Sequence, residues 1–243
     1  PTPSSAASDV YKRQSYKRAF LPTRFHSGSK LDSDLASMGI SVSSPGPSVD
    51  ANIENTLVAA VMEELVNGGT RTLSLVTNWL EVHSARVNVD RLYRILDALD
   101  KKYLNVKIYF SALGGWLSSD RRFEKIASLY QGNRVNYLSL LKSKSLDFTS
   151  SLLKKNGEDA RFENTSIIVP NGVIRRRLKD VSMANDIVKF HMPFRYRVMM
   201  GPSYRADMWA VLRRNPTHSA YKVASLAYGC LLYTSPSPRD LDL

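Results

Sequence analysis

Apolar residues recur every three to four positions through residues 51–131, and this spacing limits the possible folds more than any other feature of the chain. The first stripe runs from Ile53 to Leu65 and stops at two consecutive glycines, Gly68 and Gly69. Further stripes cover residues 70–83, 88–103, 106–117 and 118–131. A period near 3.6 is that of an α-helix with one buried face. The sequence therefore predicts five short amphipathic helices with short connections, which is the pattern of a compact helical domain.

The stripes also predict which side chains meet in the core of that domain. We expect the leucines of the third helix to pack against apolar residues of the fourth and fifth, with these members: Leu92, Leu96, Leu99, Phe110, Leu113 and Phe123. Gly114 and Gly115 lie inside the fourth helix, where each glycine costs about 1 kcal/mol relative to alanine. That cost suggests a close backbone contact at this pair.

The flanking regions are less regular. Residues 15–50 are predicted to be a disordered leader and linker, since residues 27–50 are rich in Ser, Gly and Pro. Residues 132–192 form a connecting region with one short strand at Ile167–Val169 and a helix over residues 183–191 that Pro193 should end. The fold class predicted for the whole chain is mainly α, with little β.

Both ends of the chain resemble translated sequencing adaptors. Asp9–Gln14 can be encoded by a DNA sequence that matches, over most of its length, the reverse complement of one that can encode Cys230–Ser235. An inverted element on both sides of a chain is hard to explain as evolved structure. We therefore interpret residues 1–14 and 230–243 as artefacts and expect residues 15–229 to be a fragment of a longer protein.

The positive charge is concentrated near the end of the chain. The net charge is +12, yet residues 31–170 hold equal numbers of basic and acidic residues, whereas residues 171–222 hold eleven basic residues against three acidic ones. A segregated basic segment favours a polyanionic partner, most often nucleic acid. A solvated basic face without a partner remains the alternative. The only cysteine is Cys230, which suits a reducing, cytoplasmic location.

Residues 193–229 are predicted to be a truncated DNA-binding segment, and residues 203–229 contain its most informative motif. Residues 204–214 predict a helix that Asn215-Pro216 ends, and residues 217–219 offer an N-cap for a second helix carrying Val223-Ala224 before Gly229. This segment resembles the first two helices of a winged helix-turn-helix. The resemblance implies that a recognition helix follows the glycine and enters the major groove of DNA. The spacing departs from the family, because Gly229 lies five residues after Ala224 instead of four.

The chain is thus interpreted as a DNA-binding regulator that contacts duplex DNA without sequence preference. The candidate contacts are basic residues that can neutralise phosphates. They are Arg175, Arg176, Arg177, Arg195, Arg197, Arg205, Arg213, Arg214 and Lys222.

Catalytic patterns are scarce. The four histidines are far apart in sequence, and no phosphate-binding glycine loop is recognisable. The sequence therefore predicts no metal site, no cofactor, no catalytic residues and no membrane association. Two other roles stay open: an adaptor subunit with an acidic protein partner, and a fragment of a nucleic-acid-processing protein. The oligomeric state is open.

Overall fold

The structure, a computed structural model, describes residues 20–22, 24–49, 51–141 and 146–229. The two segments interpreted as adaptor-derived lie outside these residues. The chain divides into two compact units. The larger unit is Pro22–Pro202, and the smaller one contains the described parts of Pro1–Leu21 and Ser203–Leu243.

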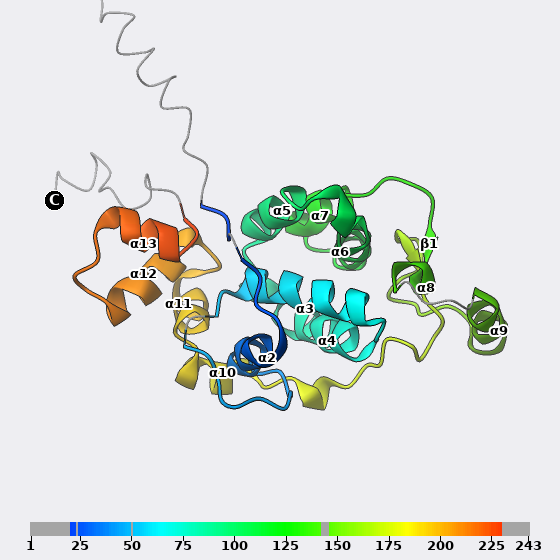
Figure 1. Ribbon diagram of the computed structural model, residues 1–243, viewed down its shortest axis with the longest axis horizontal. Helices are drawn as coiled ribbons and strands as arrows, with labels where there is room; N and C mark the ends of the chain where they lie inside the picture. Colours follow the sequence, from blue (N-terminus) through cyan, green and yellow to red (C-terminus); the bar gives the residue numbers. More distant parts are fainter. Residues whose placement is uncertain (1–19, 23, 50, 142–145, 230–243) are drawn as a thin grey trace, which may run out of the picture. The chain divides into compact units, whose positions relative to one another are not determined.

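The larger unit is mainly helical, as the sequence predicts. Its first helices are α2 (Gly28–Ser37), α3 (Ile53–Asn67), α4 (Arg71–His83), α5 (Val89–Asp97), α6 (Leu104–Trp116) and α7 (Glu124–Ala127). Those that follow are α8 (Tyr137–Leu140), α9 (Leu146–Asn156), α10 (Ala184–Phe190) and α11 (Met192–Met200). Helices α3 and α4 lie side by side, with α5, α6 and α7 above them and α2 to the left of α4 in Figure 1.

The five predicted stripes correspond to α3–α7, and their apolar faces are buried in one core. Each of the six side chains expected to meet there is at most 9 % exposed. The last stripe forms a shorter α-helix than predicted, because Arg121–Phe123 adopt a 3₁₀ turn before α7 begins at Glu124. Side-chain periodicity therefore located the buried faces better than the ends of the helices.

Gly114 allows α6 and α7 to approach at backbone distance. A Cβ atom at this position would lie 2.5 Å from the backbone nitrogen of Ala127. At Gly115 the nearest atom, Cγ2 of Thr165, would be 3.3 Å away. The glycine pair in the fourth stripe is thus a close contact, as expected, and Gly114 is the member that makes it.

The region expected to be a disordered linker contains α2. Leu31 and Leu35 lie four residues apart and are buried, together with Met38, in the core of the larger unit. A short bridge pairs Ile40 with Val181. The segment is predicted to be disordered because it is rich in serine and proline. Two leucines one helical turn apart are nevertheless enough to dock this helix of ten residues on the core.

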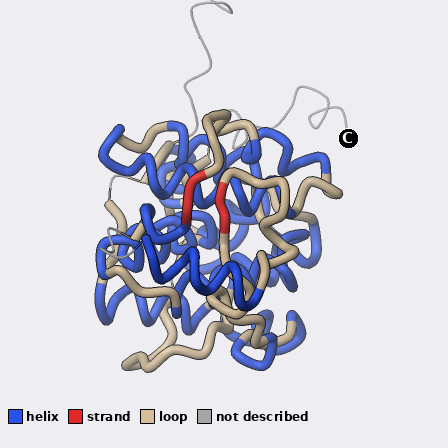
Figure 2. The backbone as a smooth tube through the Cα atoms, turned by 90° about the vertical axis from the view of Figure 1, so that its right-hand side faces the viewer, coloured by secondary structure: helices blue, strands red, loops and turns tan. Residues whose placement is uncertain are grey.

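Two short strands pair in parallel. They are β1 (Val135–Asn136) and β2 (Ile167–Ile168), and they lie side by side in Figure 2. The second agrees with the strand predicted from the sequence. Pro193 ends α10 as expected, but it also stands in the first turn of α11, where its missing N–H group costs nothing.

A buried ion cluster joins three helices of the larger unit. The carboxylate of Glu54 in α3 accepts hydrogen bonds from Nη1 and Nη2 of Arg197, at 2.6 and 2.9 Å. Its Oε2 also accepts from Nη1 of Arg91 at 3.2 Å. The backbone N–H of Asn88 also donates to Glu54, at 2.7 Å. All three charged side chains are at most 1 % exposed. Because Arg197 holds α11 to α3, the larger unit continues to Pro202, beyond the boundary at residue 193 expected from the sequence.

We expect Glu54→Ala to lower the free energy of unfolding by about 3–5 kcal/mol, because it leaves two buried guanidinium groups without their carboxylate. Urea denaturation of both proteins measures the change. The control is Glu163→Ala, which removes an exposed carboxylate and should shift stability by less than about 0.5 kcal/mol. Equal effects of the two substitutions would contradict a structural role for the cluster.

We expect Gly114→Ala to destabilise the larger unit by about 1–3 kcal/mol through overpacking against α7. Gly115→Ala is the matched control, since its Cβ has more room and alanine gains about 1 kcal/mol of helix propensity. Thermal denaturation of both variants compares them. A Gly114→Ala protein as stable as the control would show that α6 and α7 can separate without cost.

Candidate nucleic-acid interface

The structure distributes the nine candidate phosphate contacts over both units. The larger unit holds Arg175, Arg176, Arg177, Arg195 and Arg197, and the smaller unit holds Arg205, Arg213, Arg214 and Lys222. The charge excess of residues 171–222 is therefore shared between two separately packed parts of the chain. The basic residues of the larger unit and those of the smaller unit are therefore described separately.

Arg197 lies in the interior of the larger unit. Its side chain is 0 % exposed and forms the bidentate pair with Glu54, and its Nη1 also donates to the carbonyl of Arg86 at 3.0 Å. A phosphate has no route to this guanidinium, so Arg197 does not belong to an interface. The sequence could not reveal this, because the partner carboxylate is 143 residues away.

Arg195 is exposed, but its guanidinium is already used within the larger unit. Nε donates to the carbonyl of Val188 at 2.6 Å and Nη2 to that of Lys189 at 3.1 Å. These carbonyls belong to the last turn of α10, where a cation is favourable. Arg195 thus stabilises the end of a helix.

The three consecutive arginines have different surroundings. Arg176 donates from Nε and Nη2 to Glu81 of α4, at 2.8 and 2.6 Å, and this carboxylate raises the pKa of the guanidinium. Arg175 and Arg177 instead line a cleft. Arg176 is thus separated from its two neighbours by its ion pair with Glu81, 95 residues away, which the sequence alone could not indicate.

The cleft has a volume of about 710 Å³ and is lined mainly by residues of α4 and of the segment 172–180, together with Ser41, Thr70, Tyr137 and Leu152. We call it the arginine cleft. Its lining includes Arg71, Leu75 and Asn78 from α4, and Val173, Arg175 and Arg177 from the later segment. Sequence analysis assigned no role to Arg71, because a lone arginine at the start of a helix carries no pattern.

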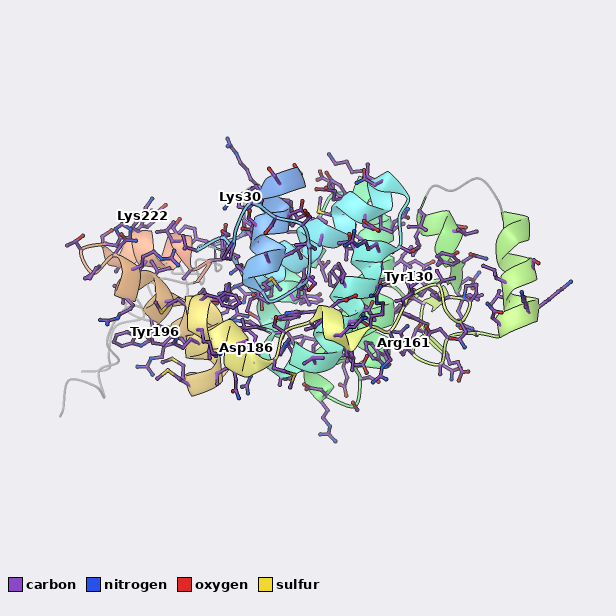
Figure 3. The ribbon with its side chains drawn as sticks, turned by 90° about the horizontal axis from the view of Figure 1, so that it is seen from below. Lys30, Tyr130, Arg161, Asp186, Tyr196 and Lys222 are labelled. Atoms are coloured by element: carbon purple, nitrogen blue, oxygen red, sulfur yellow. The ribbon has the colours of Figure 1, made fainter. Side chains whose placement is uncertain are left out.

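Hydrogen bonds hold the backbone of Arg175 beside α4. Its N–H donates to Oγ of Ser74 at 3.0 Å, and Nδ2 of Asn78 donates to its carbonyl at 3.0 Å. The preceding carbonyl, of Ile174, accepts from Arg161, which is labelled in Figure 3. The wall of the cleft that carries Arg175 is therefore fixed on both sides of the peptide.

The smaller unit is built on a helical hairpin, α12 (Tyr204–Arg214) and α13 (Ala220–Leu226). Both helices have an N-cap: Ser203 accepts from the N–H of Ala206, and Ser219, within the predicted cap segment 217–219, accepts from that of Lys222. The small apolar core between them consists of Tyr204, Met208, Val223, Ala224 and Ala227. The hairpin and its capping residues agree with the expected elements.

A tight turn follows α13. Tyr228 has a left-handed backbone, with φ of 51°, and the N–H of Gly229 donates to the carbonyl of Ala224 at 2.8 Å. The left-handed residue is thus four positions after Ala224, where the helix-turn-helix pattern has its glycine. Gly229 lies against Met208, since a Cβ atom there would be 2.3 Å from Cε at the flexible end of that side chain.

The charged groups on the surface of the hairpin are basic. Arg205, Arg213, Arg214 and Lys222 are exposed, and Figure 3 labels Lys222 on α13. Partial burial lowers the pKa of Arg214. The one carboxylate of residues 203–229, Asp207, is 3 % exposed. A polyanion that approaches the hairpin therefore meets cations without a competing surface acid.

Three large side chains are also exposed on this hairpin. Trp209 is 48 % exposed, Tyr221 59 % and Leu226 45 %. The ring of Tyr221 packs edge-on against Phe20 at 5.3 Å between centroids, within the same unit. Such side chains are enriched in protein–protein contacts, so the hairpin combines positive charge with apolar surface.

No family model, curated protein or solved structure matches this chain. Among the described residues, no group of three or more His, Cys, Asp or Glu side chains could hold a metal ion. Within the same residues, no helix is both long and apolar enough to span a membrane.

We expect Asn78→Ala to lower the free energy of unfolding by about 1–3 kcal/mol, because the substitution leaves the carbonyl of Arg175 without its buried donor. Asn156→Ala is a matched control, since Asn156 makes the same amide-to-carbonyl bond to Asn171 on the exposed surface. It should cost less than about 1 kcal/mol. Chemical denaturation distinguishes the two, and equal losses would contradict the role of Asn78 in fixing the segment.

Proposed function

We propose that this chain is a DNA-binding regulator whose smaller unit contacts duplex DNA. The observation that carries the proposal is the turn after α13. A short helix with Val223-Ala224 is followed, four residues after Ala224, by a left-handed residue, Tyr228. This is the backbone arrangement expected between the second and third helices of a winged helix-turn-helix.

The geometry of the turn bears on the one departure noted in the sequence. The resemblance calls for a left-handed conformation, which glycine adopts most readily. Here Tyr228 adopts it, and Gly229 fills a tight position against Met208 instead. The displaced glycine is therefore compatible with the resemblance.

The charge distribution supports the same proposal. Four exposed cations and a buried acid give the hairpin a positive surface that can neutralise phosphates. Phosphate contacts position a protein on DNA but carry no sequence information. The proposed mode of binding through these residues is consequently electrostatic and insensitive to sequence.

A second candidate function is a protein-interaction module with an acidic partner. The exposed side chain of Trp209 favours it, because tryptophan and arginine are typical anchors of protein interfaces. The two proposals differ in which substitutions weaken binding.

Fluorescence anisotropy with two unrelated DNA duplexes at several salt concentrations tests the proposal. We expect weak binding of both duplexes with similar affinities. The double variant Arg213→Ala/Arg214→Ala should flatten the slope of log affinity against log salt by up to about 1.8, because each phosphate contact contributes about 0.9. The variant should do so equally for both duplexes.

The control variant is Lys101→Ala/Lys102→Ala, which removes two exposed cations of the larger unit. It should leave the slope unchanged. Absence of binding at low salt would refute the DNA proposal. Retained DNA binding in Trp209→Ala, with loss only in the arginine variant, would count against the protein-interaction alternative.

A further inference from the structure

The arginine cleft of the larger unit has the features of a preformed ligand site. Its volume of about 710 Å³ lies within the range of small-molecule pockets, about 300–1,000 Å³. It is also independent of the hairpin on which the proposed DNA contact rests, since all of its lining residues belong to the larger unit.

The cleft concentrates positive charge without compensating it. Arg71, Arg175 and Arg177 line it together with a single carboxylate, Asp180, whose Oδ2 is 3.4 Å from Nε of Arg177. Within the described part of the chain, the guanidinium groups of Arg71 and Arg175 make no hydrogen bond or ion pair. Two guanidinium groups beyond the Arg177–Asp180 pair can each present a fork of N–H donors to one anion.

The walls of the cleft are held in place before any ligand binds. Ser74 and Asn78 fix the peptide of Arg175 to α4, and the N–H of Ser41 donates to the carbonyl of Asp180 at 2.9 Å. Arg71 is fixed at the start of α4, where the Glu64 carboxylate accepts the N–H of Thr72 at 3.0 Å. Fixed walls reduce the ordering cost of binding.

The cleft also offers contacts that a small inorganic anion cannot use. Leu75 and Val173 supply apolar surface in its lining. Asn78 is 1 % exposed, and its Oδ1 has no donor among the described residues, although its Nδ2 is engaged with Arg175. A ligand that fits therefore has an anionic group, an apolar face and a hydrogen-bond donor.

We propose that the arginine cleft binds a phosphomonoester of nucleotide size, with the phosphate on Arg71 and Arg175 and the nucleoside against Leu75 and Val173. A phosphate monoester is close to a dianion with three acceptor oxygens, so it can engage two arginines, whereas one arginine satisfies a carboxylate. The planar base supplies the apolar face, and its N–H groups or the ribose hydroxyls supply the donor.

Isothermal titration calorimetry of the full chain tests this site, with each of the four ribonucleoside monophosphates and inorganic phosphate as probes. We expect at least one nucleotide to bind with one-to-one stoichiometry and more tightly than inorganic phosphate. Arg71→Ala and Arg175→Ala should each weaken that binding by about tenfold or more, since each removes a charge-assisted hydrogen-bonding group. Arg175→Lys keeps the positive charge but loses the paired N–H donors of the guanidinium group. Its affinity for the nucleotide should lie between that of the alanine variants and that of the unaltered chain.

The matched control is Arg176→Ala, which removes the adjacent exposed arginine that faces Glu81 instead of the cleft. It should leave nucleotide binding unchanged. Because all three arginines are exposed, the variants should keep the thermal denaturation midpoint of the parent chain.

Three results would overturn the proposal. One is the absence of heat with any nucleotide. Another is inorganic phosphate binding as tightly as the nucleotides, which would leave the apolar wall without a role. The third is binding of a single-stranded oligonucleotide, weakened by Arg71→Ala, without binding of any mononucleotide. Arg213→Ala/Arg214→Ala should leave nucleotide binding intact, so failure of this site and failure of the DNA proposal are distinguishable.

Discussion

The pairing of Glu54 with two arginines is the interaction on which the larger unit depends. A carboxylate and two guanidinium groups that are at most 1 % exposed have lost nearly all contact with water. Glu54 offsets part of the charge of both guanidinium groups, and Arg197 also donates to the carbonyl of Arg86. The cluster joins α3, α5 and α11, and removing its carboxylate would leave two buried cations without their counter-ion. It also removes Arg197 from any role at the surface.

The same reasoning explains why a run of three arginines has no single role. Arg176 faces a carboxylate, while Arg175 and Arg177 line a cleft in which positive charge exceeds negative. The backbone of Arg175 is held to α4 through Ser74 and Asn78, while the side chain of Arg176 reaches Glu81. An arginine can contribute to an anion-binding site only where the fold points its side chain toward the site and no neighbouring carboxylate pairs with it.

The hairpin of the smaller unit shows how a pattern and its backbone can differ. The sequence has glycine one position later than the helix-turn-helix pattern, and the residue with a positive φ is Tyr228. Tyrosine tolerates this conformation at a cost of about 1–2 kcal/mol. The proposed resemblance thus depends on the backbone conformation of Tyr228, which its identity as a tyrosine does not reveal. The exposed cations and the buried Asp207 then determine what such a hairpin can attract.

The sequence by itself determined the helical class, the buried faces of α3–α7, the close contact at Gly114 and the capped hairpin of α12 and α13. These features follow from local rules, since periodicity, caps and glycine act within a few residues. Only the tertiary structure decided that α2 docks on the core, that Arg197 is buried and that Arg71 joins Arg175 in one cleft. Each of these depends on groups far apart in the chain, Arg71 and Arg175 being in separate segments and Glu54 and Arg197 being 143 residues apart. Burial and charge compensation are properties of what the folded chain brings together, and a single sequence does not state its long-range neighbours.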